Sequence, residues 1–361
     1  MNSVSVIIPA YKPDQKLIAT LHDLVRIGFT DLLVVDDGSG DAFASVFAQA
    51  AAIPECTLLR HPVNRGKGAA LKTAMAYFLD NRPEQAGVVT ADADGQHLAT
   101  DIAAVSRAML TGGNIVFGVR DFSASDVPAK SRAGNRITIG VFRLFFGMKI
   151  SDTQTGLRAF PRTVLPEIMG VKGDRYEFET HMLFLMNKRS LPLDEVGIST
   201  VYIEENKSSH FRVVRDSIRI YSLILKYLLS SIIGAVVDEG VFYLIKLLLG
   251  AVSMVWFIPG TFIAAFGARV VSSLVNYLIN AKVVFEDKTS KQTLVRYYIL
   301  AVAQILVSAA VVFLLEHLLS ISSAALSTLI KVIVDTVLFF FSFRIQHKWV
   351  FNDTKNTRER T

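Results

Sequence analysis

Four long apolar stretches near the C-terminus constrain the fold of this chain most strongly. They cover residues 227–249, 255–281, 296–316 and 323–345, and each approaches the roughly 20 residues that a helix needs to cross a membrane. Before residue 207 the apolar runs are short and are interrupted by Asp, Gly and Asn. This division excludes an ordinary soluble enzyme and predicts a soluble N-terminal domain on an all-α membrane anchor of four helices.

Basic residues flank the apolar stretches on one side of the predicted anchor. They gather at residues 207–226, 282–296 and 344–360, and the positive-inside rule places such segments in the cytoplasm. We therefore expect a multi-pass protein of the cell (inner) membrane, with the N-terminal domain and both termini in the cytoplasm. The single cysteine, Cys56, excludes an internal disulfide and agrees with a reducing compartment.

The C-terminal part also contains a short internal repeat. The sequence AKVVFED at residues 281–287 is echoed by HKWVFND at residues 347–353, which lies 66 positions later. The repeat predicts that the four helices form two related hairpins. The alternative is that Lys, aromatic residues and Asp simply collect at the membrane-proximal ends of helices.

The N-terminal part alternates short β-branched runs with segments of helical periodicity. Strands are expected at residues 4–9, 31–37, 57–60 and 87–91, and helices at residues 15–27 and 69–79. Such alternation predicts a Rossmann-like, mostly parallel α/β sheet, whose ligands bind at the carboxyl ends of its strands.

Acidic side chains follow two of these expected strands. Asp37 ends the second strand, and Asp92 and Asp94 follow the fourth, with the amide of Gln96 two residues further on. Two carboxylates and an amide on one turn suit a hard divalent ion such as Mg²⁺ or Mn²⁺. An isolated Asp-x-Asp turn is more often a solvated surface turn. Here the segment NRGKG at residues 64–68 adds two cations and a flexible backbone, which favours a site for a metal and a diphosphate.

Six motifs occur in an order that resembles glycosyltransferase family 2. They are VSVIIPAY, VVDDGSGD, NRGKGAAL, DADGQH, FGVR and SDTQTGLR, and the resemblance extends over residues 3–221. It implies the GT-A fold and, within the family, the polyprenyl (dolichol) phosphate sugar transferase branch. The implied activity is inverting transfer of a single sugar from a GDP- or UDP-linked donor to polyprenyl phosphate.

The resemblance also implies roles for individual residues. The nucleotide-sugar would be bound by Pro9, Ala10, Tyr11, Val35, Asp37, Lys67, Asp92, Ala93, Asp94, Gln96 and Arg120. The metal ligands would be Asp92, Asp94 and Gln96. The catalytic residues would be Asp94, Arg120, Arg132 and Asp152, with Asp152 near the reacting phosphate and sugar.

The segment after Arg120 is expected to meet the lipid acceptor. Residues 137–150 are too short and too charged to span a membrane and predict an interfacial helix, and a second such helix is expected near residues 213–228. A core helix with ordinary flanking arginines is the alternative for residues 137–150. The cations expected at the acceptor phosphate are Arg132, Arg136, Lys207, Arg212 and Arg215.

Two departures from the family pattern accompany these expectations. Lys207, Arg212 and Arg215 substitute for a Gly-x-Ser-Lys segment that this chain lacks, and Asp14 stands near the position of a usual glutamate. The resemblance is strongest to the dolichol-phosphate mannosyltransferases of this branch, which would imply mannose as the sugar, and both departures weaken that implication. Neither involves the expected metal ligands.

The anchor resembles the GtrA-like four-helix membrane proteins, which are associated with moving polyprenyl-linked sugars across membranes. The matching segments are Asn276-Tyr277-Leu278 and Lys348-Trp349-Val350-Phe351. The expected domains are a cytosolic glycosyltransferase domain at residues 1–220, a GtrA-like domain at 229–353 and a polar tail at 354–361. Arg269 is expected to pair with an acid of another helix, because ionisable side chains within a membrane are costly.

These inferences predict a metal-dependent hexosyltransferase of the membrane. Its expected partners are a nucleotide-sugar, undecaprenyl or dolichyl phosphate, and the lipid bilayer. Nucleic acid is not an expected partner. Whether the membrane domain also forms a homo-oligomer stays open. The alternative is a flippase of lipid-linked sugar whose N-terminal domain only captures its cargo, or both activities in one chain. A processive polysaccharide synthase is disfavoured because the chain has no QxxRW motif.

Overall fold

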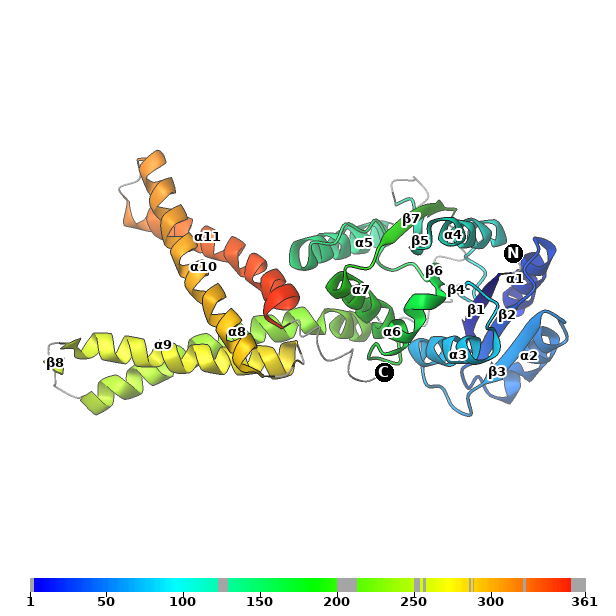
Figure 1. The fold of residues 1–361 in the computed structure, drawn as a ribbon, viewed down its shortest axis with the longest axis horizontal. Helices are drawn as coiled ribbons and strands as arrows, with labels where there is room; N and C mark the ends of the chain where they lie inside the picture. The colour runs from blue at the N-terminus through cyan, green and yellow to red at the C-terminus, as the bar shows by residue number, and fades with distance from the viewer. Residues whose placement is uncertain are drawn as a thin grey trace. The chain divides into compact units, whose positions relative to one another are not determined.

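The computed structural model describes residues 3–122, 129–199, 213–249, 254–255, 258–285, 287, 289–320 and 323–351. The chain divides into two compact units, Met1–Ile220 and Tyr221–Thr361. The first unit contains a β-sheet with helices on both sides, and the second is built from long helices (Figure 1). The polar tail expected at residues 354–361 lies outside the described residues.

The sheet of the first unit has seven strands in the order β3-β2-β1-β4-β6-β5-β7. The strands are β1 (Val4–Ala10), β2 (Leu32–Asp36), β3 (Cys56–Arg60), β4 (Gly87–Thr90), β5 (Ile115–Arg120), β6 (Arg158–Pro161) and β7 (Leu193–Ile198). Strand β6 runs antiparallel to both of its neighbours, β4 and β5, and the other pairings are parallel. The prediction of a mostly parallel α/β sheet, as in a GT-A domain, is therefore confirmed.

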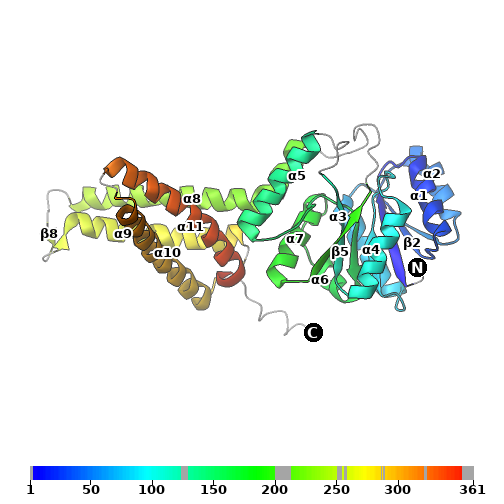
Figure 2. The same cartoon turned by 90° about the horizontal axis from the view of Figure 1, so that it is seen from above.

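Helices cover both faces of this sheet (Figure 2). One face carries α1 (Gln15–Arg26), α2 (Ala44–Ala51) and α4 (Ala99–Gly112), and the other carries α3 (Lys67–Asn81), α6 (Leu165–Met169) and α7 (Glu177–Arg189). Both expected helices of the first unit, at residues 15–27 and 69–79, are present.

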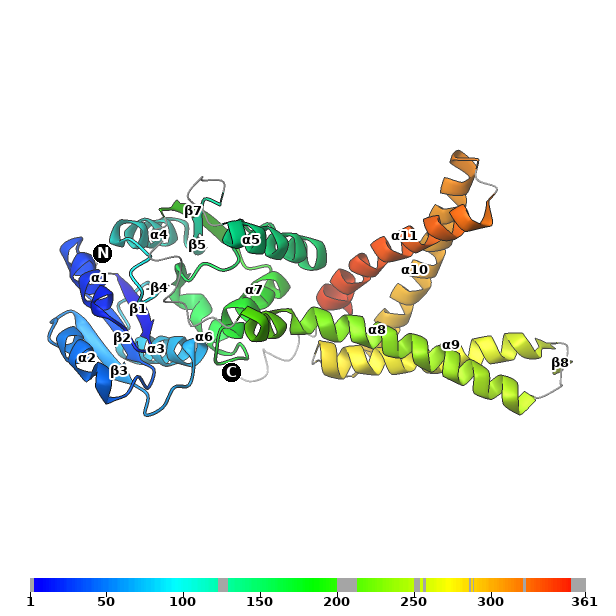
Figure 3. The ribbon, with the colours of Figure 1, turned by 180° about the vertical axis from the view of Figure 1, so that it is seen from behind.

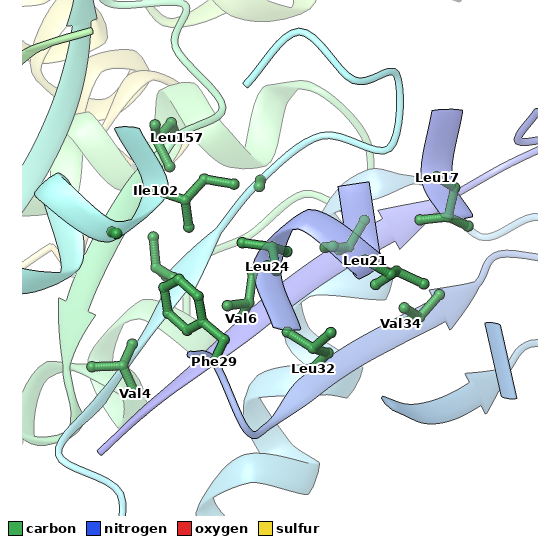
Figure 4. Packing of buried hydrophobic residues seen from close by; sticks show 14 of the residues in the cluster. Val4, Val6, Leu17, Leu21, Leu24, Phe29, Leu32, Val34, Ile102 and Leu157 are labelled. Atoms are coloured by element: carbon green, nitrogen blue, oxygen red, sulfur yellow. The ribbon is translucent and has the colours of Figure 1, made fainter. Parts of the chain in front are cut away.

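Helix α1 shows how the sequence produces this packing. Leu17, Leu21 and Leu24 share one face of the helix and are fully buried, as expected when apolar residues recur every three or four positions. They pack toward β1 and β2 (Figure 4). The carboxylate of Asp14 accepts a hydrogen bond of 2.8 Å from the backbone N–H of Lys16 and so caps the helix.

The parallel register brings the ends of three strands to one edge of the sheet. Pro9 pairs with Val35, and Ile7 pairs with Thr90. The residues that follow β1, β2 and β4 therefore leave the sheet side by side. This edge is where the acidic motifs of the sequence begin.

The helix expected at residues 137–150 has different bounds. Helix α5 (Ala129–Val141) starts earlier and continues as a π-helical turn, η2 (Phe142–Phe146). Phe146 is buried and stacks on Phe184 of α7, with ring centroids 4.5 Å apart. Because aromatic packing draws the end of the segment into the first unit, that end forms part of the core, as the alternative interpretation expected.

The described residues of the C-terminal part form four long helices, α8 (Val213–Leu249), α9 (Gly260–Ile279), α10 (Lys291–Leu318) and α11 (Ala324–Ile345). Figure 3 shows α8 beside α9 and α10 beside α11. Helix α8 is continuous and covers both the interfacial helix expected near 213–228 and the first expected span, so the interfacial placement of residues 213–228 stays a prediction. The all-α expectation needs one correction, because β8 (Met254–Val255) and β9 (Ile258–Pro259) form a short antiparallel pair between α8 and α9.

Three helical segments of the described residues are long and apolar enough to cross a membrane. They are Thr261–Val284, Lys291–Leu318 and Leu326–Val350, which correspond to the second, third and fourth expected spans. The first expected span falls on α8, and its crossing of the membrane stays a prediction. The expected ion pair is confirmed, since Arg269 of α9 lies 3.1 Å from the carboxylate of Asp238 on α8.

Equivalent residues of the internal repeat contact each other in the second unit. Helices α9 and α11 each end in a five-residue π-helical turn, η5 (Asn280–Val284) and η6 (Gln346–Val350). The side-chain amide of Asn280 donates to the side-chain carbonyl of Gln346 at 3.1 Å, and these residues are 66 positions apart. Phe285 and Phe351 follow the two turns and stack with ring centroids 5.0 Å apart. The repeat in the sequence is thus also a repeat of local structure.

Candidate active site

Asp37 lies at the end of β2 and organises the loop that precedes α3. Its carboxylate accepts hydrogen bonds from the backbone N–H groups of Arg65 at 2.9 Å and Gly66 at 2.8 Å, and from the side-chain amide of Asn64 at 3.0 Å. It also lies 2.7 Å from Nδ1 of His61. The Asp37 carboxylate is buried and committed to this loop, so any contribution to donor binding acts through the loop.

Lys67, the first residue of α3, lies between two carboxylates. Its Nζ atom is 2.7 Å from Oδ1 of Asp92 and 3.0 Å from Oε1 of Glu179 on α7. The preceding Gly66 has a φ of 106°, and a Cβ there would lie 2.4 Å from the carbonyl oxygen of Asp174. Only glycine fits this turn, which therefore fixes the position from which the Lys67 side chain extends.

Asp92 and Asp94 lie on the turn that follows β4. Oδ2 of Asp92 is 3.5 Å from Nε2 of His97, and Oδ1 of Asp94 accepts a hydrogen bond of 3.0 Å from the backbone N–H of Gln96. The Asp92 side chain is 33% exposed, so it remains accessible to a ligand. We call residues 92–97 the acidic turn.

The charges of these groups depend on one another. Burial alone would raise the pKa of Asp92, but the Lys67 ammonium and His97 hold this pKa well below its ordinary value. Burial alone would lower the pKa of Lys67, but Asp92 and Glu179 raise it. Burial, and then the charge of Asp92, raise the pKa of Asp94. Asp92 and Lys67 are thus charged at neutral pH, and a cation would relieve the repulsion between Asp92 and Asp94.

The backbone before β6 lies directly against the acidic turn. The hydroxyl of Thr90 donates to the carbonyl oxygen of Gly156 at 2.8 Å. A Cβ on Gly156 would lie 2.4 Å from Oδ2 of Asp92, so the lack of a side chain lets the backbone approach the carboxylate. The motif SDTQTGLR at residues 151–158 therefore meets the motif DADGQH in space.

Arg120, the last residue of β5, is held by Asp152. Its Nε lies 2.6 Å from Oδ2 of Asp152, and one terminal guanidinium nitrogen lies 3.0 Å from Oδ1. Oδ1 also accepts a hydrogen bond of 3.0 Å from the backbone N–H of Gln154. The Asp152 side chain is fully buried, whereas that of Arg120 is 20% exposed. The bidentate pair thus fixes the guanidinium plane and leaves Arg120 as the partner that can reach a ligand.

Arg158 begins β6 and places a second guanidinium beneath the site. It donates to the carbonyl oxygens of Thr155 and Glu179, each at 2.9 Å, and its guanidinium carbon lies 4.6 Å from the centroid of the Phe117 ring. Burial lowers the pKa of Arg158, while the charges of Glu179, Asp152 and Asp92 oppose that effect. Arg158 thus ties the backbone before β6 to α7.

The other residues expected at the donor nucleotide lie close to the same edge. Ala10 and Val35 are buried, whereas Pro9, Tyr11 and Ala93 are half-buried. Asp14 serves as the cap of α1, so the structure gives this departure from the family pattern a structural role.

The five cations expected at the acceptor phosphate are only partly described. Arg132 and Arg136 lie on α5, where Arg132 is half-buried and Arg136 is exposed. Lys207 and Arg212 lie outside the described residues, as does the side chain of Arg215 on α8. Their contribution to acceptor binding stays a prediction.

The acidic turn fits a metal that is shared with a nucleotide. The described residues contain no group of three or more His, Cys, Asp or Glu side chains that could hold a metal ion. Magnesium sites for nucleotides commonly use one or two carboxylates and complete the coordination shell with phosphates and water. Asp92 and Asp94 form such a pair of carboxylates, and their mutual repulsion favours a cation between them.

Two members of this site, His61 and Arg158, are missing from the sequence prediction, whereas Glu179 lies in a segment, YEFE at residues 176–179, that resembles the acceptor side of the family's site or has a structural role. His61 directly follows β3, so the strand-end rule that indicates Asp37 would also have found it. Arg158 carries no comparable signal, because its contact with α7 depends on how distant elements pack.

Comparison with known proteins places the chain in a family. A model of glycosyl transferase family 2 matches residues 5–169, and a model of the GtrA/DPMS transmembrane domain matches residues 226–351. An uncharacterized protein of Methanocaldococcus jannaschii is 32% identical over 230 residues, which are 62% of this chain and 92% of that protein. The chain belongs to glycosyl transferase family 2 and carries a GtrA/DPMS transmembrane domain. It is therefore a membrane-bound glycosyltransferase.

Two further similarities are to characterised proteins. UDP-N-acetylglucosamine–dolichyl-phosphate N-acetylglucosaminyltransferase of Methanococcus voltae is 26% identical over 56% of this chain and 86% of its own length. A crystal structure of glucosyl-3-phosphoglycerate synthase from Mycobacterium tuberculosis with Mn²⁺, UDP-glucose and phosphoglyceric acid has a TM-score of 0.47 and 18% identity, and covers 61% of this chain and 79% of that chain.

Proposed function

We propose that this protein transfers one sugar, with inversion, from a GDP- or UDP-linked donor to polyprenyl phosphate at the cytoplasmic face of the membrane. The observation that carries the proposal is that residues from separate motifs meet in space. Lys67 contacts Asp92, and Arg120 pairs with Asp152. The backbone of Gly156, which belongs to the same motif as Asp152, lies against Asp92. The family membership and the lipid-phosphate acceptor named for the Methanococcus voltae relative support the same reaction.

The donor would lie along the carboxyl edge of the sheet. Asp92, Asp94 and Gln96 would hold Mg²⁺ or Mn²⁺ together with the diphosphate. A bound divalent ion there supplies charge neutralisation for the departing nucleoside diphosphate. Arg120, with its orientation fixed by Asp152, would donate hydrogen bonds to the same phosphates. Asp37 would act through the 64–66 loop, which positions Lys67.

The acceptor phosphate needs little help from a base because it is already anionic near neutral pH. Its oxygen forms a bond to the anomeric carbon while the bond from that carbon to the donor diphosphate breaks, so the configuration inverts. The carboxylate of Asp152 is buried and paired, so in this scheme it positions Arg120 and takes no proton from the acceptor. The protein contributes alignment and electrostatic stabilisation.

The acceptor would reach the site at the bilayer surface. Helix α5 presents Arg136 and the exposed side chain of Ile137, and the following turn η2 adds the exposed side chain of Leu144, which suits an anionic membrane surface. The membrane-spanning helices would keep the glycosyltransferase domain beside a lipid that cannot leave the bilayer. Arg132 and Arg136 would then meet the lipid phosphate.

The reaction is tested with purified full-length protein, undecaprenyl or dolichyl phosphate, Mn²⁺ or Mg²⁺, and a panel of GDP- and UDP-sugars. One donor is expected to yield polyprenyl-phosphate sugar, and Asp94→Ala is expected to lower the rate at least about a hundredfold because the metal loses a ligand. Asp23→Asn, an exposed change on α1, is the matched control. Full activity of Asp94→Ala would refute the proposed metal role.

Translocation of the product is a second candidate function of the same chain. The observation that favours it is the pair of Arg269 with Asp238, which also accepts a hydrogen bond of 2.7 Å from Ser272, because charged groups in membrane helices commonly mark transport pathways. Vesicles with reconstituted protein and labelled polyprenyl-phosphate sugar test it. Movement to the inner leaflet should be lost in Asp238→Asn while sugar transfer is kept.

A further inference from the structure

The ammonium of Lys67 contacts the carboxylate that is expected to ligate the metal. Nζ lies 2.7 Å from Oδ1 of Asp92, which is the distance of a charge-assisted hydrogen bond. The ammonium is positively charged, and so is a divalent ion that binds to the same carboxylate. Both cannot stay on one carboxylate without strong repulsion. Metal binding at Asp92 therefore competes with Lys67.

Glu179 gives the ammonium a second anionic partner. Its Oε1 lies 3.0 Å from Nζ of Lys67, and its side chain is only 15% exposed. Glu179 belongs to α7, whereas Asp92 follows β4, so the two acids approach Lys67 from different elements. If Lys67 leaves Asp92, it remains paired. The protein thereby avoids the free-energy cost of leaving a partly buried charge without a counter-ion.

The backbone of Lys67 is held in place, so only its side chain needs to move. The preceding Gly66 is fixed by the Asp37 carboxylate through a hydrogen bond of 2.8 Å. Two residues after Lys67, the backbone N–H of Ala69 donates to the carbonyl oxygen of Asp174 at 3.0 Å. A shift of the ammonium from Asp92 toward Glu179 is then a change of side-chain rotamer, without a change in the fold.

We propose that Lys67 is a resident counter-ion of Asp92 that competes with the divalent ion, and that Glu179 takes over the ammonium when the metal binds. The inference rests on the proposed function in one respect, namely that Asp92 ligates the metal. It assigns Glu179 the role of a positioning residue that acts through Lys67 on metal affinity. It does not require any particular sugar or lipid.

The test is the affinity of the purified full-length protein for Mn²⁺, measured without donor from the electron paramagnetic resonance signal of free Mn²⁺. Lys67→Met removes the competitor and should tighten Mn²⁺ binding about tenfold, whereas Glu179→Gln removes the alternative partner and should weaken binding about tenfold, since one charge-assisted hydrogen bond is at stake. Lys67→Arg keeps a cation and should stay near the wild-type affinity. A merely structural role would not give effects of opposite sign.

The matched control is Lys72→Met, because Lys72 also lies on α3 but pairs with Asp174 at 3.2 Å. Its Mn²⁺ affinity should equal that of the wild type. Unchanged or weaker binding in Lys67→Met would overturn the competition. Asp92→Asn separates the two ideas: if it abolishes Mn²⁺ binding while Lys67→Met has no effect, the metal site stands and only the competition fails. If Asp92→Asn leaves Mn²⁺ binding unchanged, both fail.

Discussion

The two units bury polar side chains in different ways. In the first unit several are charged: Asp37, Asp152 and Arg158 belong to the candidate site, and Asp31 directly precedes β2 at the opposite end of that strand. Among the described residues of the second unit, the buried polar side chains are those of Ser230, Ser272, Asn280, Thr293, Ser342, Gln346 and His347. The buried polar side chains of the second unit are mostly hydroxyls and amides, whereas those of the first unit include charged groups.

This difference follows from what each environment can compensate. In the first unit, backbone N–H groups and opposite charges from separate strands surround each buried charge, as around Asp37 and Asp152. Between apolar helices such partners are scarce because helical backbone groups are already bonded. Neutral amides such as Asn280 and Gln346 can then satisfy each other. Three of the buried charges of the first unit thus belong to the candidate site, and the amides of Asn280 and Gln346 join the two repeats of the second unit.

The largest effect is expected when a buried charge of the first unit, that of Asp152, is removed. Asp152→Asn removes the charge that orients Arg120 and nearly preserves the side-chain volume. We expect kcat for sugar transfer to fall about a thousandfold, with Mn²⁺ affinity unchanged because Asp92 and Asp94 are intact. Steady-state kinetics and a Mn²⁺ titration measure both quantities. Asp23→Asn, which removes an exposed partner of Arg26, is the control, and a parallel loss of Mn²⁺ affinity would contradict the assignment.

Apolar packing in the first unit should give the next largest effect. Leu21 of α1 is fully buried, and Leu21→Ala should cost about 2–5 kcal/mol through lost burial and a cavity. Denaturant unfolding of the full-length protein in detergent measures this cost. Ile27, 38% exposed, offers the control Ile27→Ala, which should change stability by less than about 0.5 kcal/mol. Equal costs for both would mean that α1 does not anchor this core.

The thiol of Cys56, which is half-buried and remote from the site, should respond to pH in the opposite way to the carboxyl of Asp92. Burial, and then the charge of Asp31, raise the pKa of Cys56 to about 11. Its alkylation by iodoacetamide should therefore be about a hundredfold slower at pH 8 than in the unfolded chain, because only the thiolate reacts. The stability linked to this proton is fully present below pH 9 and is lost as the pH rises through about 11. A reaction midpoint near pH 9 would contradict this.

The smallest effect is expected when a buried neutral amide of the second unit, that of Asn280, is removed. Asn280→Ala should cost about 0.6 kcal/mol, which is typical of one side-chain hydrogen bond between membrane helices. Unfolding by dodecyl sulfate measures it, and a double-mutant cycle with Gln346→Ala should show that the two changes are coupled. Val283→Ala, at an exposed position of the same turn, is the control. Strictly additive effects would show that the amide pair does not join the two repeats.

Local patterns predicted the elements that carry the site more completely than the contacts within it. The strand-end rule places Asp37 and Asp92 at one edge, and the parallel register confirms that placement. It does not reveal that the Asp37 carboxylate binds its own loop, since that depends on the backbone direction at residues 64–66. Likewise, the apolar pattern of residues 137–150 could not show which aromatic side chains pack on Phe184.

Residue patterns alone are enough to predict an α/β domain followed by long apolar helices, and to place acids at the ends of strands. Those features depend on residue periodicity and on motifs within single segments, which neighbours in the chain largely specify. The three-dimensional packing of the elements was needed to show that Lys67 lies between Asp92 and Glu179, and that Asn280 contacts Gln346. Such contacts join residues far apart in the chain, so their geometry depends on how whole elements pack and cannot be obtained from local pattern alone.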